Sequence, residues 1–298
     1  MYTFFKKKIS KKSSIFLINN GRFSFIFNPL IKLFFKRKRC FMGQQDIIGF
    51  VTYKNIKSRF FLNHESYIEN KILNEGIHSL FILDEIVTNI KPNSIFIDVG
   101  ANIGSISIPV ANLMSKKGVE VISCEASQVV CKRFRSNVRL NIIENILINE
   151  SAIFSHDNGI TFYEQKLTNN NMGLSSSRKN FDIGEFVERK VDSISIDSLY
   201  KSLNTSKSIS VIKIDVQGGE IDVLLGAFEV IKNHKPVFIF EHEDEYHDNA
   251  MSVKNKIKSI FDKNGYDLYA LDSNLDGVLV PIDLSVYVNT NIVALPNL

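Results

Sequence analysis

Glycines and acidic residues stand directly after several apolar runs of this sequence. The first such group is the loop DVGANIG, residues 98–104. Its glycines, Gly100 and Gly104, allow the main chain to approach a ligand closely where a helix begins. Asn102 occupies the place of the second glycine in a dinucleotide-binding G-x-G-x-x-G loop. The loop therefore favours a ligand with carboxylate and ammonium groups over a pyrophosphate, although a glycine-rich turn can also serve geometry alone.

A second acid, Glu125, ends the apolar run VEVISCE, 21 residues after Gly104. A carboxylate at the end of a strand can accept hydrogen bonds from both hydroxyl groups of a ribose. The alternative is a carboxylate that is simply solvated in a loop. Two such signals at neighbouring strand ends favour a nucleoside site.

The third group lies in KIDVQGGEIDVLLGA, residues 213–227. Asp215 is expected at the same sheet edge as Asp98, where it could act as a base, orient a substrate hydroxyl or hold a ligand amine. Glu220 falls in the first turn of the following helix, where the helix dipole favours a carboxylate for structural reasons alone. A structural role for Asp215 is the alternative to a functional one.

A dense run of acids and histidines, EHEDEYHD, spans residues 241–248. Nitrogen and oxygen donors at this density could bind a divalent metal or a substrate. Their spacing matches no dedicated zinc or calcium loop, so a solvated acidic loop is the alternative and no metal ligand is assigned. If an acceptor hydroxyl must lose a proton at this edge, the candidate bases are Asp215, Glu241 and His242.

Alternating strands and helices must position these groups. Apolar runs predict strands at 94–99, 119–125, 144–151, 159–163, 209–216, 236–241, 266–271 and 289–295. Helices are expected at 103–116, after Ser127 as N-cap, after Gly219 and at 250–263. Strands buried on both faces and separated by helices predict a parallel, doubly wound sheet, whose ligands bind at the carboxyl ends of its strands.

Several local expectations are more specific. Ile221, Leu224, Leu225 and Phe228 have the spacing of one apolar helix face. Pro109 should kink or shorten the helix predicted at 103–116. Upstream, 49–53 and 59–62 could form a hairpin, and 66–90 has a helical pattern. The long polar segment 164–190 is a candidate acceptor-binding loop, with a disordered insertion as its alternative.

These motifs together resemble the FkbM family of S-adenosylmethionine-dependent O-methyltransferases. The resemblance rests on IDVGANIGSISI, CEAS, RSNVRLN, ISIDSL, IKIDVQGGEIDVLLGA and PVFIFE, in order over about residues 90–245. It implies an α/β class I methyltransferase (Rossmann-like) fold with a seven-stranded, mostly parallel, doubly wound sheet whose last strand is antiparallel. Gln217 departs from the family pattern, which commonly has Glu there, and this puts a catalytic role at that position in doubt.

The resemblance also implies site residues and an activity. The cofactor is S-adenosyl-L-methionine, its methionine part cradled by the loop from Asp98 to Gly104 and its ribose held by Glu125. The residues assigned to cofactor binding are Asp98, Gly100, Ala101, Asn102, Gly104, Glu125, Ala126, Ser151 and Asp215. The expected activity is methyl transfer to a hydroxyl group of a sugar, a glycan or a related metabolite.

The charge of the chain is unevenly distributed. Residues 1–45 carry eleven Lys and Arg and no Asp or Glu, whereas the rest carries 25 Lys and Arg against 32 Asp and Glu. The basic head is too interrupted to span a bilayer and lacks a clear secretory signal. It could lie on an anionic membrane surface, be a disordered leader or, less favoured, contact nucleic acid.

The chain has three cysteines, which cannot all pair and are too few for a disulfide framework, and this favours a reducing compartment. We therefore expect a cytoplasmic protein with peripheral contact at the inner membrane face as an option.

The expected organisation is a leader at 1–45, a hairpin and helix extension at 46–93 and a methyltransferase domain at 94–298. Three other functions remain as alternatives: a nucleic-acid methyltransferase, a non-catalytic nucleotide-binding protein anchored by its basic head and a nicotinamide oxidoreductase. The segment DVQGGE lacks the proline-containing motif of base N-methyltransferases. Three acids on one edge are not needed in a dead site, and the missing middle glycine disfavours nicotinamide binding.

Overall fold

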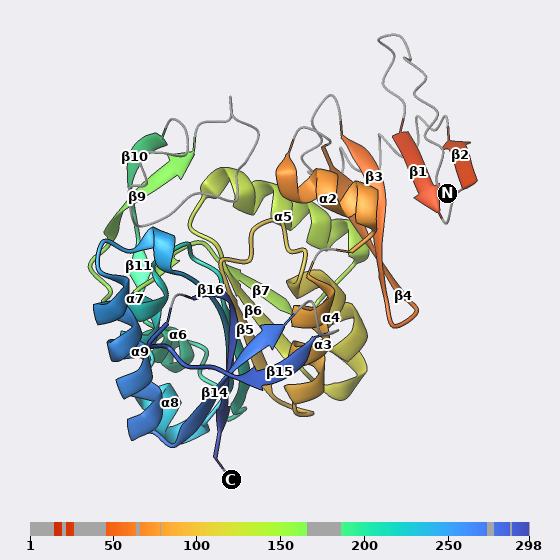
Figure 1. Ribbon diagram of the computed structural model, residues 1–298. Coiled ribbons are helices and arrows are strands. Elements are labelled where there is room, and N and C mark those ends of the chain that lie inside the picture. Colours follow the sequence, from red (N-terminus) through yellow and green to blue (C-terminus); the bar gives the residue numbers. More distant parts are fainter. Residues whose placement is uncertain are drawn as a thin grey trace.

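The molecule is built around an eight-stranded sheet with helices on both faces (Figure 1). The computed structural model describes residues 15–19, 22–26, 46–63, 66–77, 79–165, 186–272, 277–286 and 288–297. The strands are, in spatial order, β15 (Val278–Pro281), β14 (Tyr266–Asp272), β16 (Asn289–Pro296), β13 (Val237–Glu243), β12 (Ile209–Ile214), β5 (Ile95–Val99), β6 (Glu120–Cys124) and β7 (Ile146–Asn149). The five strands from β13 to β7 are parallel, and β16 runs antiparallel to both of its neighbours. The predicted doubly wound sheet with an antiparallel last strand is confirmed, and the short edge strand β15 extends it by one.

Strand alternation divides the core between the two faces of the sheet. Along β5, Ile95, Ile97 and Val99 face one helical layer and Phe96 faces the other. The first layer contains α6 (Ile196–Ser202), α7 (Glu220–Leu225), α8 (Phe228–His234) and α9 (Ala250–Lys263). The opposite layer contains α3 (Leu80–Asn89), α4 (Ser107–Met114) and α5 (Gln128–Asn141) (Figure 1). Charged residues on these strands are therefore exceptions that need partners.

Smaller sheets flank this core. An N-terminal sheet has the order β2 (Arg22–Ile26), β1 (Ile15–Asn19), β3 (Ile47–Tyr53) and β4 (Ile56–Leu62). The predicted hairpin is confirmed as β3 and β4, joined by Lys54 and Asn55, both with positive φ, as a type I′ turn requires. Two further sheets have two strands each: β8 (Ala152–Ile153) pairs with β11 (Ser193–Ile194), and β9 (Ile160–Gln165) pairs with β10 (Phe186–Val191).

Two predicted helices prove shorter than their sequence pattern. The helix expected at 103–116 begins at Ser107, because Asn102 and Gly104 have positive φ and cannot belong to it. Pro109 lies in its first turn, where a missing N–H removes no helical hydrogen bond. Residues 66–90 form two helices, α2 (Tyr67–Glu75) and α3, separated by the left-handed Gly76. Ser127 caps α5 as predicted, accepting from the main chain of Val130.

The predicted apolar face of the helix after Gly219 is wrong in its second half. Ile221 and Leu224 are buried, but Leu225 and Phe228 are more than half exposed. The helix ends at Leu225 and a new one begins at Phe228. Gly226 is the C-cap of the first helix, and a Cβ there would overlap the main-chain oxygen of Phe154. The spacing i, i+3, i+4, i+7 therefore joined residues of two separate helices.

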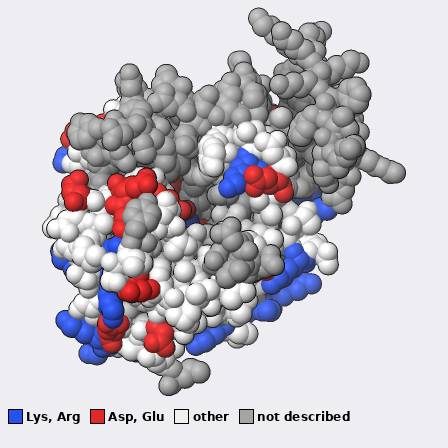
Figure 2. All heavy atoms as spheres, viewed as in Figure 1, with Lys and Arg blue, Asp and Glu red and all other residues white. Residues whose placement is uncertain are grey.

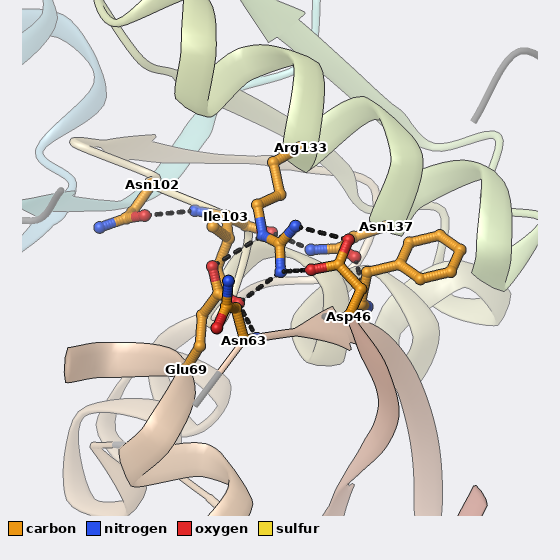
Figure 3. Close-up of polar contacts among 8 residues, drawn as sticks. Asp46, Asn63, Glu69, Asn102, Ile103, Arg133 and Asn137 are labelled. Atoms are coloured by element: carbon orange, nitrogen blue, oxygen red, sulfur yellow. Dashed lines mark hydrogen bonds and ion pairs between the residues drawn. The ribbon is translucent and has the colours of Figure 1, made fainter. Parts of the chain in front are cut away.

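A buried ion-pair network fastens the N-terminal extension to this core (Figure 3). Arg133 of α5 donates from Nη1 and Nη2 to Asp46, at 3.0 and 2.8 Å. Its Nε and Nη2 donate to Glu69 of α2, at 2.7 and 2.5 Å. Asn137, one turn later on α5, accepts from the main chain of Phe61 and donates to that of Ile103. The guanidinium thus joins α2 and the residue that precedes β3 to α5, and Asn137 joins β4 to the loop that precedes α4.

We expect Arg133→Met to destabilise the protein by about 3–5 kcal/mol, because it leaves two buried carboxylates without their cation. Arg135→Ala is the matched control, since that side chain is 43% exposed and pairs with Glu150 at the surface. Its loss should cost less than about 1 kcal/mol. Chemical denaturation of both variants measures the difference. A cost for Arg133→Met no larger than that of the control would contradict a structural role for the network.

Candidate active site

A cavity of about 470 Å³ opens at the carboxyl ends of the parallel strands, where the sequence predicts ligand binding. Its volume lies in the range of small-molecule sites. Seven of the nine residues predicted for the cofactor line it: Gly100, Ala101, Asn102, Glu125, Ala126, Ser151 and Asp215. Glu241, a predicted base, lines it as well. The turns after β5, β6, β7, β12 and β13 therefore converge on one space.

The other two predicted cofactor residues lie outside the lining of this cavity. Asp98 is fully buried on β5, where it accepts a hydrogen bond from Ser107 and pairs with Lys213. Gly104 has φ +86°, and a Cβ there would overlap the ring of Phe134. Asp98 and Gly104 therefore stabilise the two ends of the loop through contacts inside the protein.

Lys213 is a buried cation beneath the cavity. Its Nζ lies 3.1 Å from Asp98 Oδ1 and 3.3 Å from Asp215 Oδ2, and it donates to the main-chain oxygen of Gly100 at 3.3 Å. Burial disfavours its charged form, but Asp215 and Asp98 outweigh burial and raise the pKa of Lys213. Lys213 was not predicted as a site residue. The signal was present, because a lysine inside the apolar strand ISVIKIDV must have a partner.

The main-chain N–H groups of the loop after β5 donate hydrogen bonds to acceptors within the protein. The N–H groups of Gly100 and Ala101 both donate to the oxygen of Cys124, and that of Gly104 donates to Ala101. The N–H of Asn102 donates to Glu125 Oε2 at 3.0 Å, and that of Ile103 donates to the side chain of Asn102. All five consecutive N–H groups therefore have partners within the protein, so this loop does not offer them to a phosphate.

Glu125 is fixed by two of the surrounding main-chain groups. Oε2 accepts from Asn102, and Oε1 accepts from the N–H of Ser127 at 2.8 Å. Burial raises the pKa of Glu125 to about 7, against the lowering effect of these two hydrogen bonds. A carboxylate oxygen can accept more than one hydrogen bond, so both oxygens of Glu125 can still accept from a ligand in the cavity.

Among the described residues, carboxylates dominate the charge of the cavity wall. Glu125, Asp215, Glu241 and Glu243 line it, against the cations Lys71 and Lys213. Acidic side chains also gather at the surface over the segment that follows β13 (Figure 2). Burial, with the nearby carboxylates of Asp215 and Glu243, raises the pKa of Glu241 to about 7. A group with this pKa can take up a proton near neutral pH.

Gln217, where the family commonly has Glu, lies between two of these acids. Its amide nitrogen is 3.4 Å from Asp215 Oδ1 and 3.4 Å from Glu241 Oε2. Its φ of +49° turns the chain sharply before Gly218. A glutamate at this position would add a fourth negative charge beside Asp215, Glu241 and Glu243, whereas an amide can donate to both neighbours.

His242, the third predicted base, does not face the cavity. Along β13 it shares a face with Phe238 and Phe240, opposite the face of Glu241, and it is fully buried. Its Nε2 lies 3.1 Å from Asp244 Oδ1, and burial lowers the pKa of His242. The prediction placed neighbours in sequence at one site, but strand alternation sends them to opposite sides of the sheet.

A second cavity, of about 380 Å³, adjoins the first. The two share six lining residues, namely Lys71, Ser79, Ile82, Lys213, Asp215 and Glu241. The second adds polar side chains of β16, namely Asn289, Thr290 and Asn291. The sequence did not single out these residues. Of the predicted acceptor loop 164–190, residues 166–185 lie outside the described part of the chain, and its two ends belong to β9 and β10.

Among the described helices, none is long and apolar enough to cross a membrane. The side chains of the basic head, residues 1–45, lie outside the described part of the chain. Its contact with a membrane surface therefore stays a prediction, as do the predicted segment boundaries at residues 45 and 93.

The fold and the cavity at its strand ends are those of a class I methyltransferase. The sequence profile of the Methyltransferase FkbM domain matches residues 98–268. The chain belongs to the FkbM methyltransferase family, as the resemblance of its motifs indicates. No curated protein matches the sequence.

Several solved structures of methyltransferases are similar to this chain at low sequence identity. Methyltransferase FkbM from Methylobacillus flagellatus KT is 19% identical, with a TM-score of 0.42 over 69% of this chain. This chain spans only 44% of that protein's length. M. jannaschii TYW2, crystallised in complex with AdoMet, is 13% identical, with a TM-score of 0.41 over 85% of this chain and 87% of its own. Precorrin-6y C5,15-methyltransferase from Geobacter metallireducens GS-15 is 11% identical, with a TM-score of 0.40 over 72% of this chain and 87% of its own.

The close contact at Gly100 generates a prediction. A Cβ at this residue would overlap the main-chain oxygen of Asp215, and φ is +74°. Gly76 has a similar φ of +80°, but a Cβ there would meet nothing within 4 Å. Gly76→Ala should therefore cost about 1–2 kcal/mol for the left-handed conformation alone. Gly100→Ala should cost clearly more in denaturant titrations, because it also separates the loops after β5 and β12. Equal costs for the two variants would contradict this contact.

Proposed function

We propose that this protein is an S-adenosylmethionine-dependent O-methyltransferase that acts on a hydroxylated metabolite, such as a sugar or a glycan. The observation that supports it is the charge of the cavity. Four carboxylates line it, and the main-chain N–H groups of the loop after β5 donate hydrogen bonds within the protein. This surrounding suits a ligand that carries a sulfonium and an ammonium group, and it disfavours the pyrophosphate of a nicotinamide cofactor.

The residues present fit S-adenosylmethionine. Glu125 would accept from the ribose hydroxyl groups, and Asp215 would hold the ammonium group of the methionine part. Gly100 and Ala101 leave the main chain uncovered beside it, where any larger side chain at residue 100 would collide with the opposite loop. Ala126, Ile153 and Phe162 give the cavity an apolar side suited to an adenine ring.

When bound, the cofactor supplies the methyl group on a positively charged sulfur, an electrophile that no protein side chain provides. The protein has to align an acceptor oxygen with that methyl group and exclude water. Glu241, with a pKa of about 7, can take the proton that the acceptor hydroxyl gives up. Gln217 keeps the carboxylate of Glu241 beside that of Asp215.

The second cavity supports a hydroxylated acceptor. It meets the first at Asp215 and Glu241, and Asn289, Thr290 and Asn291 border it. Amide and hydroxyl side chains can both donate to and accept from sugar hydroxyl groups. The predicted loop 164–190 would add further contacts, and contact of the basic head with a membrane would bring the enzyme to a membrane-bound acceptor.

Calorimetric titration of the purified chain with S-adenosylmethionine, S-adenosylhomocysteine and NAD tests the cofactor. We expect both S-adenosyl compounds to bind and NAD not to bind. Glu125→Gln should weaken S-adenosyl binding about 10–100-fold, because the variant loses charge-assisted hydrogen bonds to the ribose. Preference for NAD, or no S-adenosyl binding, would refute the proposal.

The pH dependence of this binding has a definite sign. Glu125 has a raised pKa of about 7, so a proton competes with the ligand below that pH. Affinity for S-adenosylhomocysteine should be constant above about pH 8 and should fall up to about tenfold per pH unit below about pH 6. The slope should become shallower in Glu125→Gln. It should remain in Glu241→Gln, which removes the other cavity group with a pKa of about 7.

The proposed base generates a separate prediction. Once an acceptor is known, Glu241→Gln should lower kcat about 10²–10⁴-fold while cofactor affinity near pH 8 changes little. Glu245→Gln is the matched control, because Glu245 is an exposed carboxylate of the same segment. An unchanged kcat in Glu241→Gln would exclude Glu241 as the base.

A further inference from the structure

Behind the cavity wall, three side chains with metal-binding groups meet in the core. One carboxylate oxygen of Glu220 and one ring nitrogen each of His242 and His247 all lie within 4.8 Å of one another. All three side chains are at most 3% exposed. They come from the first residue of α7, from β13 and from the segment after the short turn Asp244–Tyr246. Solvation, the alternative for the run EHEDEYHD, thus applies to some of its acids but not to its histidines.

The distances are close to those of a transition-metal site. His247 Nε2 lies 3.6 Å from Glu220 Oε2, and the two imidazole rings stack with centroids 4.9 Å apart. In a tetrahedral zinc site, bonds of about 2.0–2.1 Å place neighbouring ligand atoms about 3.3 Å apart. Small side-chain movements would bring the three donors to that separation. Two imidazoles and a carboxylate are a ligand set that zinc and other first-row divalent metals prefer.

The two ring nitrogens of His242 have different surroundings. Its Nε2 lies 3.1 Å from Asp244 Oδ1, while its Nδ1 is buried and has no hydrogen-bond partner among the described residues. If Nε2 donates to Asp244, Nδ1 carries the lone pair. A carboxylate on the far nitrogen of a histidine is the usual outer partner of a metal-bound imidazole.

The outer partner is itself held in place. Asp244 Oδ2 accepts from Lys254 Nζ at 2.7 Å, and Lys254 also donates to the main-chain oxygen of Val286. The charge of Asp244 is therefore balanced by Lys254, which is 2% exposed. Glu220 then contributes one negative charge to the cluster, and a divalent cation would find one anionic and two neutral donors.

We propose that Glu220, His242 and His247 bind a divalent transition metal, with zinc as the best fit. Three protein ligands leave one tetrahedral position for a water molecule. Glu220 also accepts from the N–H of Gly218 through Oε1, at 2.8 Å. The metal would therefore hold the turn of Gln217 and Gly218 against the end of β13. Both of these segments border the cavity. The proposal does not depend on the identity of the cofactor or acceptor.

Metal titration of the purified full-length chain tests this proposal. After dialysis against a chelator, Zn²⁺ is added in competition with a chromophoric chelator. We expect one tightly bound equivalent and a rise in Tm of about 4 °C when free metal is 100 times the Kd. His247→Gln and Glu220→Gln should each weaken binding at least about 100-fold, more than loss of an outer partner does. His156→Ala, which removes an exposed histidine, should bind as the native chain does.

Cobalt substitution keeps the test valid if a variant fails to fold. Co²⁺ bound to the native chain should give the visible absorption bands of a tetrahedral nitrogen and oxygen site, and Zn²⁺ should abolish them. No tight equivalent of Zn²⁺, or a cobalt spectrum of octahedral type, would overturn the proposal. So would equal binding by folded His247→Gln and the native chain, and the cluster would then be a metal-free polar core.

Discussion

The site depends on one buried cation. Lys213 lies between Asp98 on β5 and Asp215 at the end of β12, and it also donates to the main chain of Gly100. Without its ammonium group, two carboxylates at the centre of the sheet would face each other in a region of low dielectric. The cation therefore allows the two central strands to end with acids, and it sets the distance between the loops that border the cavity. Gly100 completes the arrangement, because only a residue without a side chain fits against Asp215.

Much of this molecule could be predicted from its sequence because the parallel strands are buried on both faces. Their apolar runs predict the sheet, and the ends of those runs predict the edge where Gly100, Glu125 and Asp215 meet. Local pattern failed where tertiary contacts decide. Gly226 caps the end of α7 and lies against the main chain of Phe154, and no spacing of apolar residues could reveal that contact. Lys71 reaches the cavity from α2, a helix outside the motifs that indicate the family.

β13 shows how one strand serves two different environments. Glu241 and Glu243 face the cavity, whereas His242 faces α7 and α9 together with Phe238 and Phe240. The sequence EHE therefore places two acids in contact with ligand space and a histidine in the core. From the sequence, Glu241 and His242, together with Asp215, are candidate bases at one edge of the sheet. Successive side chains of a strand point to opposite faces, and this separates Glu241 from His242. The rule could be used here only once β13 was known to extend to Glu243.

The Arg133 network bears on what counts as the functional unit of this chain. The matched family domain begins at residue 98, yet Tyr67, Ile68, Lys71, Ser79 and Ile82 form part of the cavity wall. Glu69, on the same helix as Lys71, is fastened to α5 by Arg133. A fragment that began at residue 98 would retain the acids at the strand ends. It would lose the part of the cavity wall that α2 and its neighbouring residues form. In this protein the unit that forms the cavity is larger than the family domain that identifies it.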